Sequence, residues 1–477
     1  MGTPSKEFNE DSIHWIPLGG IVALGLLLQL APVPNGLTEQ AWSLFIIFAL
    51  TILALILKPL PMGAVAFLSL TTATLTRTLS ITDVFIGYAQ KELWLIVFAC
   101  FIARAFIKTG LAARIAYLML AAIGRTTIGL GYAFMLSGLI LAPAMPSSTA
   151  RAGGILVPIM RALSLALGSH PNDPSSIRIG TYLAMIVFHS TVLGSAIFLT
   201  GMAPNPILTE NARSLGVEIS WMLWFKAAIV PGALCALLLP WVIRIFAPPT
   251  LTETKAAVTH AKEKLEEMGS IRLGEWKMII CLVGLLSLWI FGRFLGIDPT
   301  AAAMVGVSFL LLTEVLTWTD LIQERNAWET LFWFAALLVM ATQLNTLGFI
   351  PWFTSGIEQF FLQARWEVVF ACLLLIYFYS HYLFASIFAH ISSMFLPFLA
   401  LCISAGTPPV LASLALAHAS GLFGGITHYS SGQAPIVFSE KYVPVGLWWK
   451  TGFVVCSLSL LIWCTVGFAW WKWLGIW

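Results

Sequence analysis

The chain is poor in charge and in the motifs of soluble enzymes. Of its 477 residues only 10% are charged and 59% are hydrophobic, whereas ordinary soluble domains carry roughly a quarter charged residues. The seven cysteines lie singly, without a CxxC pair, so we expect buried thiols and no metal or cofactor. HExxH, GxSxG and Walker-type motifs are absent, which argues against an enzyme. The net charge is only +3, and no nucleic-acid partner is expected.

Long apolar runs make up most of the chain, which is therefore expected to lie in a lipid bilayer. Eleven runs are long enough to cross the bilayer as helices. Two further apolar stretches, 128–166 and 367–403, are interrupted by proline or polar residues. We expect an all-α polytopic membrane protein with about eleven transmembrane helices and two re-entrant helical hairpins. The eleven runs lie near 15–31, 40–58, 62–76, 92–107, 180–200, 219–246, 276–293, 299–317, 328–348, 409–426 and 447–471.

The N-terminus does not look like a cleaved targeting segment. Between Met1 and His14 it mixes Lys6 with acidic residues, unlike a basic signal peptide or an acid-poor transit sequence. We expect it to be retained, to be cytoplasmic, and to belong to a bacterial inner-membrane protein. With this orientation most basic residues fall on the inner side, as the positive-inside rule requires. They include Lys108, Arg114, Arg125, Arg161, Arg178 and Arg244.

One short pattern occurs twice, about half a chain apart, inside the two interrupted stretches. Ser147-Ser148-Thr149-Ala150-Arg151 runs on to Pro158, and Ser386-Ile387-Phe388-Ala389-His390 runs on to Pro397. Cationic side chains at membrane depth are costly and are usually kept for a function. Two of them at matching positions suggest one binding site built from two halves of the chain.

The two halves can be aligned well beyond this pattern. Five crossings separate Glu92 from its counterpart Glu329, and because this number is odd the halves should be inverted relative to each other. We expect a first half over 1–247, a cytoplasmic amphipathic linker over 248–274, and a second half over 275–477. Further pairs in the same order are Thr109 with Thr346, Gly194 with Gly425, Gly201 with Gly432, Pro204 with Pro435, and Lys226 with Lys450.

Each half also contains two breaks in its helices. Pro143 and Pro146 cannot continue a helix interior, and Ser147 follows as a good N-cap for a new helix. This predicts a hairpin that enters the membrane, turns and returns. The next span of each half is broken as well, at 200–206 and at 430–435. Irregular backbone at this depth is tolerated only where protein or a water-filled cavity surrounds it.

The hairpin tips have the chemistry of an anion site. Arg151 and His390 each lie four residues after a capping serine and so share its helix face. A helix N-terminus attracts anions, and arginine can pair with a carboxylate through two hydrogen bonds. Two such tips facing each other would bind a dicarboxylate. The candidate binding residues are Ser147, Ser148, Thr149, Arg151, Thr200, Gly201, Pro204, Ser386, His390, Ser431, Gly432 and Pro435.

These assignments have structural alternatives. Arg151 could instead stabilise its hairpin or extend its charge to the membrane surface, and His390 could be a hydrogen-bonded core residue. The breaks at Gly201 and Gly432 could be ordinary kinks. The matching positions of the two halves favour the functional interpretation.

With its paired hairpins and broken spans, the chain resembles the divalent anion/sodium symporter family over nearly its whole length. The segment Thr427 to Pro435 and the tip Ser386 to His390 are most similar to the dicarboxylate exchanger branch, which includes 2-oxoglutarate/malate translocators and citrate or tartrate/succinate antiporters. The resemblance implies a homodimer, in which a transport domain of hairpins and broken spans moves against a fixed scaffold in an elevator-type alternating-access mechanism.

The sequence departs from the family's paired Ser-Asn-Thr motifs. The resemblance places Ser147 to Thr149 on the first motif and Ser386 to Phe388 on the second, but Asn is missing from both. Ile387 and Phe388 also remove the amide and the hydroxyl of the second motif, so the second sodium site in particular should be lost.

We therefore expect a secondary transporter that exchanges dicarboxylates of the 2-oxoglutarate, malate and succinate class without sodium. The alternative is a sodium-coupled dicarboxylate symporter with a degenerate motif. A receptor or a channel is disfavoured, because two helix breaks related by inversion suit alternating access better than a continuous pore.

Overall fold

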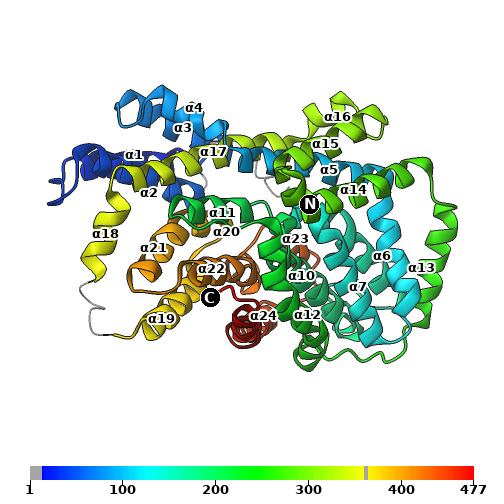
Figure 1. The fold of residues 1–477 in the computed structure, drawn as a ribbon. Helices are drawn as coiled ribbons and strands as arrows, with labels where there is room; N and C mark the ends of the chain where they lie inside the picture. The colour runs from blue at the N-terminus through cyan, green and yellow to red at the C-terminus, as the bar shows by residue number, and fades with distance from the viewer. Residues whose placement is uncertain (1–12, 58, 359–363) are drawn as a thin grey trace, which may run out of the picture.

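The computed structural model describes residues 13–57, 59–358 and 364–477 (Figure 1). Within these ranges every regular element is a helix, and an isolated bridge joins Thr126 to Glu253. Nine of the described helices are long and apolar enough to cross a membrane, and four shorter apolar helices accompany them. The expected all-α polytopic fold is confirmed. Most of the N-terminal segment expected in the cytoplasm, residues 1–12, lies outside the described residues.

The upper layer of Figure 1 is formed by helices from the beginning of each half. Here α5 packs against α15 and α17, and α17 also packs against α2 and α3. Helices from the two halves are therefore interleaved in this layer. It contains α1 (Trp15–Gln29), α2 (Glu39–Leu57), α3 (Met62–Leu75), α4 (Ile81–Tyr88), α5 (Lys91–Thr109), α14 (Leu273–Leu295), α15 (Pro299–Leu312), α16 (Trp318–Gln323) and α17 (Arg325–Thr346).

The lower layer is centred on α10, which covers Gly180–Ile197 and is buried at every residue. Such a helix has no amphipathic face, because protein surrounds it on all sides. It packs against α7, α12 and α22. The main helices of this layer are α7 (Thr127–Leu141), α12 (Trp221–Phe246), α19 (Trp366–Tyr379), α22 (Pro409–Leu422), α24 (Val445–Ile462) and the C-terminal α25 (Phe468–Trp473).

The two interrupted stretches fold with the same succession of elements. In each, a helix gives way to a short 3₁₀ turn, a capping serine, four α-helical residues, a π-turn and a final helix. A proline is the second residue of each final helix. The first stretch continues from α7 through η1 (Ala142–Ala144), α8 (Ser148–Arg151), η2 (Ala152–Leu156) and α9 (Val157–Ala166), and the second from α19 through η5 (Ser380–Leu383), α20 (Ile387–His390), η6 (Ile391–Phe395) and α21 (Leu396–Ser404).

The two broken spans match each other in the same way. After α10 the chain forms the 3₁₀ turn η4 (Leu199–Gly201) and resumes as α11 (Asn205–Ser214). After α22 it forms η7 (Phe423–Gly425) and resumes as α23 (Gln433–Ser439). The contacts are reciprocal, because α23 packs on η2 of the first hairpin and α11 packs on η6 of the second. Each broken span thus meets the hairpin of the other half.

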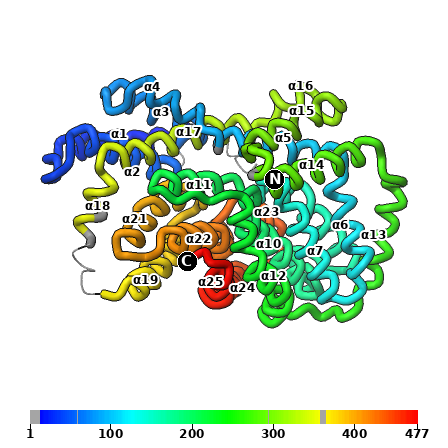
Figure 2. The backbone as a smooth tube through the Cα atoms, viewed as in Figure 1, coloured from blue at the N-terminus to red at the C-terminus, as the bar shows by residue number. Residues whose placement is uncertain are grey.

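Three helices flank the layers at the two sides of Figure 2. The polar stretch of the sequence forms α13 (Lys255–Met268), which lies along α6 (Leu111–Ile123) on one side, and α18 (Phe349–Glu358) lies on the other. A buried ion pair links α6 to α14, because Arg114 of α6 donates to Glu275 of α14 over 2.5 Å. Arg114 also donates to the carbonyl oxygen of Gly269, just after α13.

Candidate functional site

The first hairpin tip is a capped helix start, as the sequence predicts. Ser147 has an extended conformation, and its hydroxyl accepts a hydrogen bond from the Ala150 amide over 3.1 Å. Ser147 and Ser148 are half-buried and Thr149 is exposed. The tip therefore offers three hydroxyl side chains that are not enclosed by the core.

Arg151 is fully enclosed and binds protein oxygens only. Its Nη1 donates to the carbonyl oxygens of Met145 and of Gly201, the latter over 2.8 Å. Its Nη2 donates to the Thr191 carbonyl over 3.1 Å and contacts the Ser195 hydroxyl at 3.4 Å. Nε is buried without a partner, and no carboxylate in the described part of the chain forms an ion pair with Arg151. Arg151 thus links the first hairpin to the first broken span, and its positive charge has no counter-charge among the described residues.

The first broken span is tied tightly to this hairpin. Thr200 is buried, and its hydroxyl donates to the Pro143 carbonyl over 2.7 Å. A side chain at Gly201 would lie 2.2 Å from the Gly194 carbonyl oxygen, so the fold requires glycine there. Pro204 is buried at the start of α11. The Thr200 hydroxyl and the Gly201 carbonyl thus bond the first broken span to the first hairpin.

The second hairpin tip has the same capping geometry but a different surface. The Ser386 hydroxyl accepts from the Ala389 amide over 3.4 Å. Ile387 is buried, and the Phe388 ring lies edge-on to Trp333 with 4.1 Å between ring centroids. The two residues that follow the cap therefore contribute apolar packing where the first tip has hydroxyls.

His390 is fully buried and stacks beside a second histidine, His381. Their Nδ1 atoms are 3.0 Å apart. The outer nitrogen of His381 is 2.8 Å from the Ser430 carbonyl oxygen, and that of His390 is 3.2 Å from the Ser380 hydroxyl. The second tip is thus joined through His381 to the second broken span.

The second broken span also meets the first hairpin tip. The Ser148 hydroxyl donates to Gln433 Oε1 over 3.0 Å. Gly432 is exposed, and a side chain there would lie 2.6 Å from the Thr149 hydroxyl. The Ser431 hydroxyl is buried and has no hydrogen-bond partner among the described residues. Pro435 is exposed on α23, two residues after Gln433.

Gln433 and His381 belong to this constellation but are not among the candidates that the sequence supplies. Gln433 lies inside the broken segment and its repeat partner is Met202, so the alignment of the halves does not single it out. His381 lies before the repeated pattern of Ser386 to His390, so that pattern does not single it out either. A better signal for both is a polar side chain next to a helix break in an otherwise apolar stretch.

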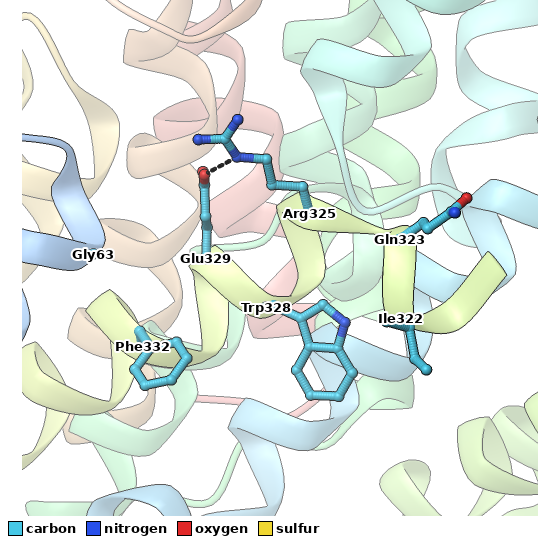
Figure 3. Close-up of a pocket in the computed structure, with 7 residues that line it drawn as sticks. All are labelled: Gly63, Ile322, Gln323, Arg325, Trp328, Glu329 and Phe332. Carbon is cyan, nitrogen blue, oxygen red and sulfur yellow. Dashed lines mark hydrogen bonds and ion pairs between the residues drawn. The ribbon is translucent and has the colours of Figure 1, made fainter. Parts of the chain in front are cut away.

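A surface hollow lies elsewhere, at the start of α17 (Figure 3). Within it Arg325 Nε donates to Glu329 Oε1 over 2.6 Å. The residues that line it come from α3, α16 and α17 rather than from either hairpin, so we do not assign it to the anion site. They are Gly63, Ile322, Gln323, Arg325, Trp328, Glu329 and Phe332.

Solved structures with this fold are membrane transporters. The chain superposes on MtrF of Neisseria gonorrhoeae with a TM-score of 0.59 and 12% identity, over 94% of this chain and 96% of that one. It superposes on the YdaH transporter of Alcanivorax borkumensis with a TM-score of 0.53 and 13% identity, over 83% and 87% of the two chains. At these identities the likeness concerns the fold alone.

Sequence relatives are far more similar. The putative malate transporter YflS of Bacillus subtilis is 46% identical over 478 aligned positions, which cover 100% of both chains. The chloroplastic dicarboxylate transporter 1 of Arabidopsis thaliana is 44% identical over 97% of this chain and 83% of its own length. The family model of the sodium:sulfate symporter transmembrane region matches residues 12–477. Because this match covers nearly the whole chain, the protein belongs to the sodium:sulfate symporter family, that is, the divalent anion/sodium symporter family of membrane transporters.

Proposed function

We propose that this protein exchanges dicarboxylates such as 2-oxoglutarate, malate and succinate across the membrane without sodium. The observation that carries the proposal is the uncompensated charge of Arg151. Its guanidinium is fully buried and has oxygen partners but no carboxylate among the described residues. A bound dicarboxylate supplies the missing negative charge. The names of the relatives, a malate transporter and several dicarboxylate transporters, support the same substrate class.

The fixed charge also accounts for exchange rather than one-way transport. Moving an unpaired buried charge past apolar surroundings costs several kcal/mol. An empty site therefore moves poorly, whereas a site that holds a dicarboxylate moves readily. Each inward crossing must then be followed by an outward crossing with substrate.

The surroundings of the hairpin tips disfavour sodium. Sodium is a hard cation that needs several oxygen ligands. The first tip has hydroxyls, but the carbonyl oxygens beside it already accept hydrogen bonds from Arg151, whose positive charge repels a cation. At the second, Ile387 and Phe388 offer no side-chain oxygen. No transport step is assigned to sodium.

The two layers suggest how the movement occurs. The lower layer, which contains both hairpins and both broken spans, would be the mobile transport domain, and the upper layer would be the scaffold. This is an elevator-type mechanism of alternating access, carried out by a homodimer in the bacterial inner membrane with the N-terminus in the cytoplasm. The full-length match to a bacterial relative supports the bacterial membrane.

Counterflow in proteoliposomes tests the proposal. Purified protein is reconstituted into vesicles with and without internal malate, and uptake of labelled malate, succinate and 2-oxoglutarate is measured in sodium, potassium and choline buffers. Exchange predicts uptake only into loaded vesicles, with rates that agree within about twofold among the cations because no step uses sodium. Sodium-dependent uptake into empty vesicles would instead establish a symporter, and rapid uncoupled flux a channel.

A further inference from the structure

The hydrogen bonds of the histidine pair allow only one arrangement of protons when both rings are neutral. The Ser430 carbonyl can only accept, so His381 carries its proton on Nε2 and its Nδ1 is an acceptor. His390 must then donate from Nδ1 to His381 Nδ1, over 3.0 Å. This leaves His390 Nε2 as an acceptor, 3.2 Å from the Ser380 hydroxyl, which can donate to it.

The same heavy atoms accommodate one additional proton. If His390 Nε2 is protonated, it donates to Ser380 Oγ, and the Ser380 hydroxyl turns to donate to the Tyr377 carbonyl, 2.9 Å away. Every nitrogen of the pair is again satisfied, and only one hydroxyl hydrogen has moved. A second additional proton would place hydrogens on both facing Nδ1 atoms, which are too close for that.

No carboxylate holds this pair in its charged form. Among the described residues neither histidine forms an ion pair or hydrogen bond with Asp or Glu. The carboxylates on helices that pack against η6 are Glu39 of α2, Glu210 of α11 and Glu329 of α17. Glu210 and Glu329 bind Arg213 and Arg325. On α19, which packs against η5, Glu367 binds Arg365. The other titratable groups on the surrounding elements are Cys372, Tyr377 and Tyr379 of α19, Tyr382 of η5, Cys402 of α21, His418 of α22, and His428 and Tyr429 of the second broken span.

We propose that His381 and His390 form a site for a single proton, which is bound together with the dicarboxylate and released with it. Both imidazoles are fully buried, so the charged form is disfavoured until an anion is present. With the proton, the pair and Arg151 together carry two positive charges, which match a dicarboxylate. This inference rests on the proposed function, and it adds that the second half of the site supplies its charge only when substrate is bound.

Proton uptake on binding is the direct test. Exchange of one dicarboxylate for another moves no net proton, so the measurement is calorimetric titration of the full-length protein with malate, near neutral pH, in two buffers with different ionisation enthalpies. The buffer dependence gives the number of protons taken up. We expect close to one proton per malate for the wild type and none for the double variant His381→Gln/His390→Gln. His418→Gln, which changes a buried histidine bound to the Ala196 carbonyl, should leave the uptake unchanged.

A second variant keeps both imidazoles. Ser380→Ala removes the oxygen that accepts a hydrogen bond from protonated His390 Nε2, so the proton affinity should fall by about tenfold or more, because a hydrogen bond to a charged group is lost. The midpoint of proton uptake should then move to lower pH. Malate binding and exchange without proton uptake in the wild type would overturn this inference alone, as would uptake that persists in the double variant or is unaffected in Ser380→Ala. Absence of malate exchange would overturn the proposed function itself.

Discussion

The Ser148 hydroxyl donates a hydrogen bond to Gln433 Oε1 over 3.0 Å, although the two residues are 285 positions apart in the chain. This bond joins the tip of the first hairpin to the broken span of the second half. Together with the contacts of α11 on η6 and of α23 on η2, it brings both hairpins and both broken spans into one connected site.

Removal of this bond should weaken substrate binding. In Ser148→Ala, the side-chain amide oxygen of Gln433 loses its partner, and the first tip loses this hydrogen bond to α23. We expect the half-saturation concentration for malate to rise about fivefold, corresponding to the roughly 1 kcal/mol of a typical hydrogen bond. Ser137→Ala is the matched control, because the Ser137 hydroxyl bonds only to the Ala133 carbonyl of its own helix. If Ser148→Ala and Ser137→Ala had the same half-saturation concentration for malate, Ser148 would not belong to the binding site.

The two capping serines should act through their hydroxyls on the substrate as well as on their helices. Ser147→Ala and Ser386→Ala should each weaken malate binding by about 1–2 kcal/mol, the range for hydrogen bonds to charged groups. Glycine is nearly as good an N-cap as serine, so Ser147→Gly and Ser386→Gly restore helix capping without a hydroxyl. If the glycine variants bind malate like the wild type, the serines serve only as caps. If glycine and alanine variants are equally impaired, the hydroxyls contact the substrate.

The close approach of Gly432 to Thr149 can be tested with one variant that introduces a steric clash and a second that removes it. In Gly432→Ala the new methyl group would lie 2.6 Å from the Thr149 hydroxyl. The two elements must then separate, and the exchange rate should fall by about tenfold or more, since overpacking commonly costs about 1–3 kcal/mol. The double variant Gly432→Ala/Thr149→Ala removes the hydroxyl and should recover most of the rate of Thr149→Ala alone. A double variant as slow as Gly432→Ala would show that the contact is not what requires glycine.

The buried ion pair of α6 and α14 should matter for stability rather than for substrate affinity. Glu275→Gln leaves Arg114 without its counter-charge, and loss of one member of a buried pair typically costs about 3–5 kcal/mol. The thermal unfolding temperature in detergent should fall clearly, while the half-saturation concentration of the remaining folded protein stays the same. Glu253→Gln, which breaks an exposed pair with Lys255, should leave the unfolding temperature unchanged. A stable Glu275→Gln protein would contradict this account.

The sequence predicted the elements of the site better than their mutual contacts. Proline and serine at Pro143, Pro146 and Ser147 act through local backbone geometry, so the capped breaks could be found without knowing the fold. The repeat of the pattern predicted the second tip. Long-range contacts leave no such local trace, and the bond from Ser148 to Gln433 depends on how two distant helices pack.

Arg151 illustrates the same limit. Its spacing from Ser147 predicts that it shares the face of the capping serine, and we expected its donors to face a carboxylate. The structure directs four of its contacts to protein oxygens instead, because the tip packs against α10 and the break: the acceptors are Met145 beside the tip, Thr191 and Ser195 of α10, and Gly201 at the break. Its charge, rather than its hydrogen bonds, is what the site offers to a substrate in this conformation.

The role of that charge in coupling can be separated from the role of those hydrogen bonds. Arg151→Gln removes the charge and keeps some donors, whereas Arg151→Lys keeps the charge and loses the planar fork. If the fixed charge prevents the empty site from moving, efflux of labelled malate from preloaded vesicles should require external dicarboxylate in the wild type and in Arg151→Lys. Arg151→Gln should bind malate more weakly and should show a clearly higher ratio of unstimulated to stimulated efflux, because its empty site carries less charge across the apolar barrier. An unchanged ratio in an Arg151→Gln protein that is folded and still binds malate would mean that a feature other than this charge enforces exchange. A raised ratio in both variants would assign the coupling to the hydrogen bonds between the hairpin and the broken span.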